Sequence, residues 1–263
     1  MIEASNASVS IGATRIVSDV RFRALPGQVT TIVGPNGSGK STLLKALCGD
    51  LRYDGSITVD GREVASMKPV EAAGMRAVLP QAAVLAFPFT VHEVVRLGLV
   101  GGRSGALAGE AARLPERALA KVDLEGYAGR FYQELSGGEQ QRVQLARVLC
   151  QVWAPVLGGR ARFLLLDEPV SSLDIRHQLL VMDIARDFAR RGGGVVAILH
   201  DLNLAAMYGD RIFAMHHGRL AAAGTPDEVL SDALIEKVFG CRLKVGQLPT
   251  DRVPFVLPQS AAT

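Results

Sequence analysis

A glycine-rich stretch that follows a short apolar run decides the fold. It reads Gly34-Pro35-Asn36-Gly37-Ser38-Gly39-Lys40-Ser41-Thr42 and fits the pattern GxxxxGK[ST]. Glycines let successive backbone N–H groups turn toward phosphate oxygens, and a helix that begins near Lys40 adds its positive dipole end. In this pattern the lysine faces the β- and γ-phosphates, and the Ser41 hydroxyl reaches Mg²⁺. We therefore predict that residues 34–42 hold the phosphates of a nucleoside triphosphate.

The segments on either side of this loop alternate between strand-like and helix-like patterns. Val29–Val33 is apolar and β-branched, as in a buried strand, and leads directly into the loop. Further strands are expected at Ser18–Ala24, Ile57–Val59, Arg76–Leu79, Phe163–Asp167 and Val195–His200, with a closing hairpin of Ile212–Met215 and Leu220–Ala223. Helices are expected at Ser41–Cys48, Val91–Leu97, Glu110–Val122, Gly137–Cys150, Ile175–Arg190 and Leu202–Tyr208. This alternation predicts an α/β fold, with a parallel sheet covered by helices on both faces.

Composition excludes several classes of protein. The net charge of +3 over 263 residues gives no reason to expect nucleic acid as a partner. No apolar run is long enough to cross a membrane, and the first residues do not resemble a signal peptide. The three cysteines, Cys48, Cys150 and Cys241, are far apart and form no CxxC pair, so we expect free thiols and no zinc site.

Two carboxylates follow the apolar run Phe163–Leu166. Ligands of open α/β sheets bind at the carboxyl ends of the strands, where Asp167 and Glu168 would lie. Asp167 is suited to the Mg²⁺ shell, and Glu168 to orienting and deprotonating the attacking water. The simpler interpretation, a strand that ends in a solvated acidic turn, loses weight because the same chain carries the phosphate loop.

A third motif, Leu135-Ser136-Gly137-Gly138-Glu139-Gln140, opens the helix expected to end at Cys150. Ser136 and Glu139 have the spacing of a capping box, so a well-capped helix is one interpretation. The paired glycines cost helix stability and leave N–H groups bare at the helix N-terminus, which favours a second anion site. The residues alone leave both interpretations open.

Together these motifs resemble the nucleotide-binding subunit of ABC transporters over nearly the whole chain. GPNGSGKST resembles the Walker A loop, LLLDEP the Walker B strand and LSGGEQQRVQLAR the family signature. The resemblance implies a P-loop NTPase (RecA-like) core with a small antiparallel β subdomain and an inserted α-helical subdomain. It also implies one nucleotide-binding domain, with residues 1–81 and 136–240 as the catalytic core, 82–135 as the helical subdomain and 241–263 as a loose C-terminal tail.

The same resemblance implies roles for further residues. Gln81, in VLPQ, matches the Q-loop glutamine that contacts Mg²⁺ and the attacking water, and Ser172-Leu173-Asp174 resembles the D-loop. His200 matches the switch histidine that contacts the γ-phosphate, although a lone histidine at a strand end is more often structural. The family places an aromatic residue on adenine where this chain has Ile11, or Val9 if the register slips. The loss of stacking predicts modest nucleotide affinity or base selectivity.

Family resemblance also implies the cofactors ATP and Mg²⁺ and a set of partners. Two copies would pair head to tail, so that each ATP lies between residues 34–42 of one copy and Ser136, Gly137, Gly138, Glu139 and Gln140 of the other. Two transmembrane permease subunits would bind the dimer, a periplasmic substrate-binding protein would act indirectly, and the chain would lie at the cytoplasmic face of the inner membrane.

Cargo is inferred by resemblance alone. The stretch AFPFTVHEVVRLG is similar to importers of iron-siderophores, haem and cobalamin, and ELSGGEQQRVQLARVLCQVW and ILHDLNLAAMYGDRI resemble the ATPases of haemin import. We expect haemin, with an iron-siderophore or cobalamin as the alternatives. Phe87, Phe89 and Val91 could serve the core or a permease-facing surface. The pair His216-His217 sits on an expected turn, and we do not expect it to bind haem.

Other classes are less consistent with these motifs. A soluble ABC ATPase acting on DNA or ribosomes would carry long coiled coils or two cassettes, and this chain has neither. A GTPase or kinase would not explain residues 136–140, and no NKxD segment is present. A regulatory ATP sensor would bind the nucleotide without turnover.

Overall fold

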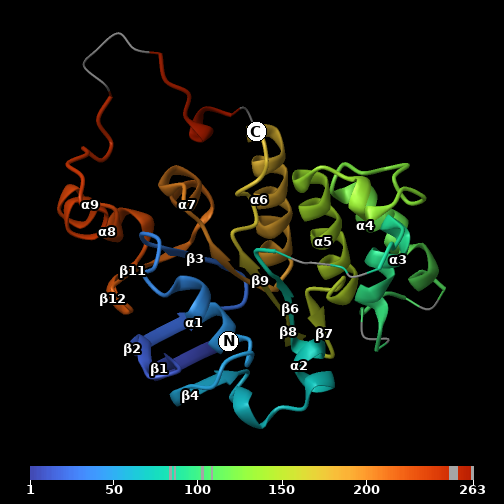
Figure 1. Cartoon of the computed structure of the whole chain (residues 1–263), viewed down its shortest axis with the longest axis horizontal. Helices are drawn as coiled ribbons and strands as arrows, with labels where there is room; N and C mark the ends of the chain where they lie inside the picture. Colours follow the sequence, from blue (N-terminus) through green and yellow to red (C-terminus); the bar gives the residue numbers. More distant parts are fainter. Residues whose placement is uncertain (83–84, 86, 102–103, 108, 249–253, 262–263) are drawn as a thin grey trace.

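A six-stranded sheet runs through the middle of the computed structural model, which describes all residues except 83–84, 86, 102–103, 108, 249–253 and 262–263 (Figure 1). In spatial order its strands are β12 (Arg219–Gly224), β11 (Arg211–His216), β3 (Val29–Val33), β10 (Gly194–Ile198), β9 (Phe163–Asp167) and β6 (Arg76–Leu79). The five strands from β11 to β6 are parallel, and β12 closes the sheet as an antiparallel hairpin with β11. The expected α/β class with a parallel sheet is confirmed.

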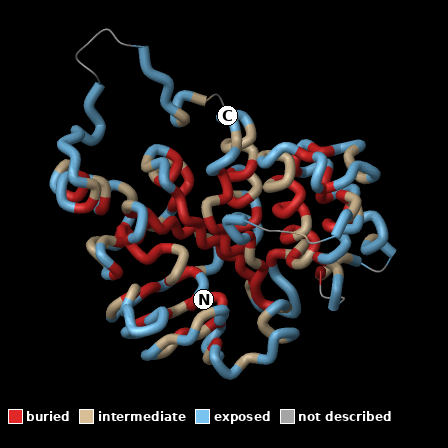
Figure 2. Tube along the Cα trace, viewed as in Figure 1, coloured by how far each residue is buried: buried red, intermediate tan, exposed pale blue. Residues whose placement is uncertain are grey.

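Successive residues of the central strands face two different cores. In β9, Leu164 and Leu166 pack toward one face, whereas Phe163 and Leu165 pack toward the other. All four side chains are fully buried. A strand with both faces covered has no solvent side, which explains why these strands are apolar throughout rather than alternating. In Figure 2 the buried residues form a continuous band along this sheet.

One face of the central sheet is covered by α1 (Lys40–Leu47) and a four-stranded antiparallel sheet (Figure 1). The strands of this second sheet lie in the order β2 (Thr14–Ala24), β1 (Ile2–Ile11), β4 (Asp54–Val59) and β5 (Arg62–Glu63). Leu43, Leu44 and Leu47 of α1 are buried between the two sheets. The first turn of α1, which follows the phosphate loop, is thereby fixed on both sides.

The other face is covered by three helices, α5 (Gly137–Gln151), α6 (Ile175–Arg190) and α7 (Leu202–Tyr208) (Figure 1). The expected bounds of α6 and α7 agree with the structure. Two shorter helices, α3 (Val91–Arg96) and α4 (Leu114–Lys121), pack on α5 rather than on the sheet. The helix expected at Glu110–Val122 is shorter because the α-helix begins at Leu114, next to Pro115, after the 3₁₀ turn Ala111–Arg113.

Several elements were not predicted. They are β1, β5, α2 (Pro69–Met75), α8 (Pro226–Val229), α9 (Asp232–Phe239) and the two-stranded pair β7 (Val156–Leu157) and β8 (Arg160–Ala161). Short 3₁₀ turns lie at Val64–Ser66, Leu97–Leu99, Tyr132–Glu134 and Pro258–Ser260. In the expected loose tail, Gln259 donates a hydrogen bond to the carbonyl of Asn203 in α7. Parts of that tail, and of the segment between the helices expected at Val91–Leu97 and Glu110–Val122, lie outside the described residues. The described part of the chain has no helix long and apolar enough to cross a membrane.

Gly194, the first residue of β10, is a position in the fold that has no room for a side chain. A Cβ there would stand 2.2 Å from Cε1 of Phe163, whose ring is fully buried. Gly194→Ala should therefore lower the free energy of unfolding by about 1–3 kcal/mol, the usual cost of overpacking a core. Urea denaturation measures it. Gly129→Ala is the control, because a Cβ there meets nothing within 4 Å. Equal midpoints for the two variants would contradict the close packing of Gly194.

Candidate functional site

The residues singled out from the sequence gather at one edge of the central sheet because four adjacent strands end there. Strands β3, β10, β9 and β6 are parallel neighbours, with Ile198 paired to both Ile32 and Asp167, and Leu166 paired to Leu79. Their carboxyl ends therefore meet. The phosphate loop follows β3, His200 follows β10, Asp167 and Glu168 end β9, and Gln81 follows β6. One expectation is corrected: β10 ends at Ile198, so His200 lies two residues beyond the strand and not at its last position.

The phosphate loop has a backbone that side chains could not follow. Gly34, Gly37 and Gly39 all have positive φ angles. A Cβ on Gly34 would stand 2.2 Å from the carbonyl oxygen of Met215, so the chain passes this strand too closely for any other residue. No side chain caps the first turn of α1, which leaves its N–H groups for a ligand, and the buried Ser38 hydroxyl has no hydrogen-bond partner among the described residues. These features fit an oxyanion cradle.

Lys40 lies inside this loop. Its side chain is 5% exposed, and its Nζ donates to the carbonyl oxygens of Gly34 at 2.9 Å and Pro35 at 3.0 Å. Burial lowers the pKa of Lys40, while the nearby carboxylates of Glu168 and Asp167 act in the opposite direction. A buried ammonium group with only carbonyl partners is poised for an anionic ligand.

Ser41 and Asp167 form the part of the site that is suited to a divalent cation. The Ser41 hydroxyl donates to Oδ1 of Asp167 at 3.0 Å, and Asp167 is 4% exposed. Burial raises the pKa of Asp167, and the neighbouring Glu168 raises it further, so the negative charge here is incompletely compensated. Hydroxyl and carboxylate oxygens are ligands that Mg²⁺ prefers. The donor set therefore fits Mg²⁺, although the described residues contain no cluster of three or more acidic, histidine or cysteine ligands.

Both carboxylate oxygens of Glu168 are engaged within the site. Nε2 of His200 lies 2.7 Å from Oε1, and Nε2 of Gln81 donates to Oε2 at 2.9 Å. The Glu168 side chain is only 14% exposed, whereas that of His200 is 41% exposed. The side chains of Gln81 and His200, which lie 87 positions before and 32 positions after Glu168 in the chain, thus meet on its carboxylate.

Glu168 also has an unusual backbone, with a φ of 52° in the left-handed region. This conformation is uncommon for a residue with a side chain and is often found at functional sites. Its carbonyl oxygen accepts hydrogen bonds from Nε2 of Gln141 at 2.8 Å and from Oγ of Ser171 at 3.2 Å. Neither Gln141 nor Ser171 was predicted as a site residue. The only feature of the sequence that could have indicated them is their place directly after Leu135–Gln140 and shortly after Asp167-Glu168. Gln141 links the start of α5 to the strained Glu168.

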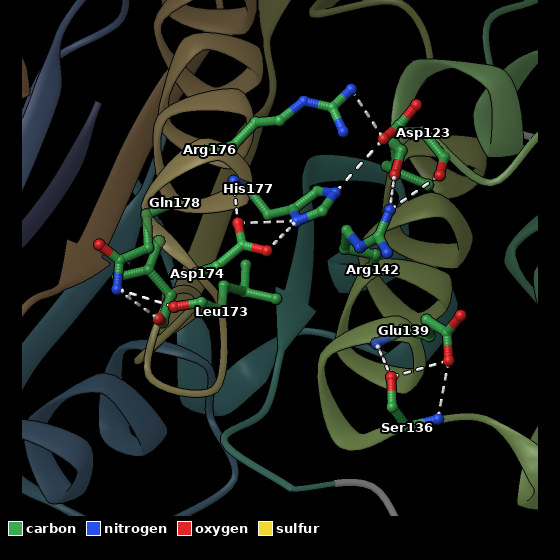
Figure 3. A network of polar contacts seen from close by, with 11 residues as sticks. Asp123, Ser136, Glu139, Arg142, Leu173, Asp174, Arg176, His177 and Gln178 are labelled. Carbon is green, nitrogen blue, oxygen red and sulfur yellow. Dashed lines mark hydrogen bonds and ion pairs between the residues drawn. The ribbon is translucent and has the colours of Figure 1, made fainter. Parts of the chain in front are cut away.

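Residues 136–140 begin α5, as expected, and Figure 3 shows the Ser136–Glu139 pair at this helix end. Glu139 accepts hydrogen bonds from the N–H of Ser136 at 2.8 Å and from its hydroxyl at 2.7 Å, and these bonds hold the pKa of Glu139 below its usual range. The capping box is therefore real. A Cβ on Gly138 would stand 3.0 Å from the carbonyl oxygen of Ser172, so this helix end lies against the segment Ser172–Asp174. Together the two segments line a cavity of about 430 Å³.

The structure does not bring residues 136–140 to the phosphate loop of the same chain. Among the described residues, no hydrogen bond joins the two segments. Gln140 points inward and donates to the carbonyl oxygens of Tyr132 at 3.2 Å and Leu135 at 3.1 Å, so its side chain supports the preceding turn. Within one chain the expected site is divided between two places.

Other candidate residues are sorted by their burial. Ile11, at the end of β1, is 54% exposed, whereas Val9 is in the core, so only Ile11 is free to cover a base. Val91 is fully buried, Phe89 packs partly against the core and Phe87 is 69% exposed. The cysteines are free thiols, as expected, with Cys48 and Cys150 buried and Cys241 exposed.

The pair His216-His217 lies where β11 meets β12, with ring centroids 4.0 Å apart, but the expected turn holds only His217, because His216 is the last residue of β11 and pairs with Arg219. They line a cavity of about 320 Å³ beside Pro35–Ser38 of the phosphate loop.

Known proteins share this sequence and geometry. The family profile described as ABC transporter matches residues 17–171. Two proteins named hemin import ATP-binding protein HmuV, from Mesorhizobium japonicum and from a Chelativorans species, are 72% and 65% identical to this chain, over 99% of both chains in each case. A dimeric ATP-binding cassette solved in a post-hydrolysis state with ADP and Pi has a TM-score of 0.74 at 26% identity, covering 86% of this chain and 99% of that one. The chain therefore belongs to the ABC transporter family.

Proposed function

We propose that this chain is the ATP-hydrolysing, energy-coupling subunit of a bacterial import complex whose cargo is haemin. One observation carries the catalytic part: Glu168, next to the Ser41–Asp167 pair and the phosphate loop, has its two carboxylate oxygens held by Gln81 and His200. A carboxylate in that place is suited to accept a proton from a water that attacks a γ-phosphate. Family membership and the close relatives support the same assignment.

Each group of residues at the carboxyl ends of the central strands has a separate role in this proposal. Backbone N–H groups of residues 34–42 and the ammonium of Lys40 bind the phosphates, and Ile11 covers the base. Ser41, Asp167 and Gln81 would hold Mg²⁺, which supplies charge neutralisation at the β- and γ-phosphates when bound. Glu168 orients the attacking water and accepts its proton, and His200, whose ring is partly exposed, donates to a γ-phosphate oxygen.

The second half of each site comes from a second copy of the chain in this proposal. Ser136–Gln140 lies away from the phosphate loop of its own chain, and the N-terminus of α5 carries two glycines with little side-chain cover. A head-to-tail pair would place that helix end on the γ-phosphate held by the other copy. The solved cassette at 26% identity is described as a dimer, which supports this arrangement.

The remaining assignments concern the membrane complex. Two relatives at 72% and 65% identity are named hemin import ATP-binding proteins, and we extend that cargo to this chain. Two permease subunits then bind the dimer, a periplasmic substrate-binding protein delivers haemin from the other side, and the chain sits peripherally at the cytoplasmic face of the inner membrane. Residues 82–135 serve as the helical subdomain that presses on the permease, with residues 1–81 and 136–240 as the catalytic core.

Glu168→Gln should abolish most turnover while preserving ATP binding. The amide keeps the size of the carboxyl and can still meet Gln81 and His200, but it cannot accept the water proton. General-base catalysis is worth about 10²–10⁴-fold, so we expect a loss of that size in kcat. Steady-state ATPase and nucleotide titration measure the two effects. Glu236→Gln, which alters an exposed ion pair between Glu236 of α9 and Arg242, should leave both turnover and ATP binding unchanged. Near wild-type turnover for Glu168→Gln would exclude Glu168 as the base.

Ser136→Arg should block closure of the dimer while sparing ATP binding by single chains. The variant loses a helix cap, worth about 1 kcal/mol, and places a large cation where the proposal puts the other copy's nucleotide. Ser231→Arg is the matched control, because Ser231 caps α9 in the same way, away from residues 136–140. We expect the ATPase of Ser136→Arg to fall to a few per cent and that of Ser231→Arg to persist. Equal activity in the two would count against a shared site.

Haemin should stimulate ATP hydrolysis by the complete complex. With the permease in liposomes and the haemin-loaded binding protein inside, the ATPase rate should rise severalfold above that with the unloaded binding protein. A response to an iron-siderophore or to cobalamin instead would transfer the role to that cargo. An ATPase rate that neither the permease nor any of these cargoes changes would favour a soluble ABC ATPase.

A further inference from the structure

His177, in the first turn of α6, lies between two carboxylates that belong to different parts of the fold (Figure 3). Its Nδ1 is 2.9 and 3.0 Å from the two carboxylate oxygens of Asp174, and its Nε2 is 3.3 Å from Oδ2 of Asp123. The ring is only 15% exposed. A backbone bond adds to the contact, because Asp174 accepts from the N–H of His177 at 2.9 Å. The ring of His177 therefore contacts both Asp123, which lies 54 positions earlier in the chain, and Asp174, which lies 3 positions earlier.

The donor and acceptor roles in these contacts depend on which ring nitrogens carry a proton. An ionised carboxylate only accepts hydrogen bonds, so each ring nitrogen needs a proton to make its contact. A neutral imidazole carries one N–H and would turn a lone pair toward the other carboxylate. The imidazolium form donates to both. Hydrogen bonds from His177 also hold the pKa values of Asp123 and Asp174 below their usual range, which is consistent with two ionised partners.

Asp123 is held from a second side. It follows α4 and has a φ of 57°, a left-handed conformation that aspartate tolerates better than most residues. Arg142 of α5 donates from Nη1 to the carbonyl oxygens of Val122 at 2.9 Å and Asp123 at 2.8 Å, and Arg176 of α6 lies 3.0 Å from its carboxylate. The turn after α4 is thus tied to α5 through its backbone and to α6 through its side chain.

Asp174 marks the other end of the bridge. It caps α6 and closes the segment Ser172–Asp174, which lies against Gly138 at the start of α5. His177 and Arg142 line the same cavity as Ser136 and Gly138. Whatever fixes Asp174 therefore also fixes the segment that packs beside Ser136–Gln140.

We propose that His177 is a positioning residue that ties the segment Ser172–Asp174 to the turn at Asp123 and so keeps the face around Ser136–Gln140 ready to receive a second copy of the chain. This inference rests on the proposed shared site. His177 touches no nucleotide and no reacting atom. Without the bridge, the segment must be ordered at the moment of closure, and that ordering cost raises the ATP concentration at which two copies associate.

ATP-driven association in the Glu168→Gln background tests the proposal without interference from hydrolysis. Adding His177→Gln should raise the ATP concentration for half-maximal dimer by about three- to tenfold, measured by sedimentation velocity, because the single NH2 group of glutamine would have to replace two nitrogens at different places on the ring. Nucleotide affinity of the single chain should not change. Arg176→Gln is the control: Arg176 is 75% exposed and shares Asp123, but it does not contact Asp174, so its effect should stay within about twofold.

A double-mutant cycle separates the bridge from general damage to the fold. His177→Gln and Asp123→Asn share the contact between His177 and Asp123, and each also removes a contact of its own, so their combined effect on dimerisation should be smaller than the sum of the two single effects. Additive effects, or an unchanged ATP dependence for His177→Gln, would overturn the role of His177. Absence of any ATP-driven dimer in the Glu168→Gln parent would instead overturn the proposed shared site.

Discussion

The pairing of β9 with a parallel neighbour on each side is the constraint on which the site depends. Ladders to β10 and β6 fix Asp167 opposite Ile198 and Leu166 opposite Leu79. A slip by one residue would move Leu164 and Leu166 to the face that now holds Phe163 and Leu165, and both faces are packed. The positions of Asp167 and Glu168 relative to the phosphate loop are therefore set by the core, and the loops only complete the arrangement.

The parts of the fold that sequence could predict are those with a strong local or positional signal. Strands without alternating polar residues, such as Val29–Val33 and Phe163–Asp167, are predicted to be buried on both faces, and both are. Parallel strand ends then bring Gln81 and His200 to the same edge, whatever the details of the loops. Short elements escaped prediction: α2 and α8 have only a turn or two of pattern, and β7 and β8 have two residues each. In contrast, α9 has two local signals, a cap at Ser231 and a terminating Gly240, from which the helix could have been predicted.

Contacts that depend on how helices face one another could not be predicted. Gln141 meets the carbonyl of Glu168 because α5 lies across the end of β9, and His177 meets Asp123 because α6 lies beside the turn after α4. Both are tertiary facts with no local pattern. A capped helix and an anion site at Ser136 do not exclude each other, because the capping box uses only Ser136 and Glu139, while Gly137 and Gly138 place no side chain over the backbone of the first turn.

The surroundings of Glu168 limit the directions from which a water molecule can approach it. Each carboxylate oxygen has two lone pairs, and Nε2 of His200 lies on Oε1 while Nε2 of Gln81 donates to Oε2. A water that gives its proton to Glu168 must therefore come in along one of the remaining lone-pair directions. The two neighbouring side chains thus act as a template for the direction of attack.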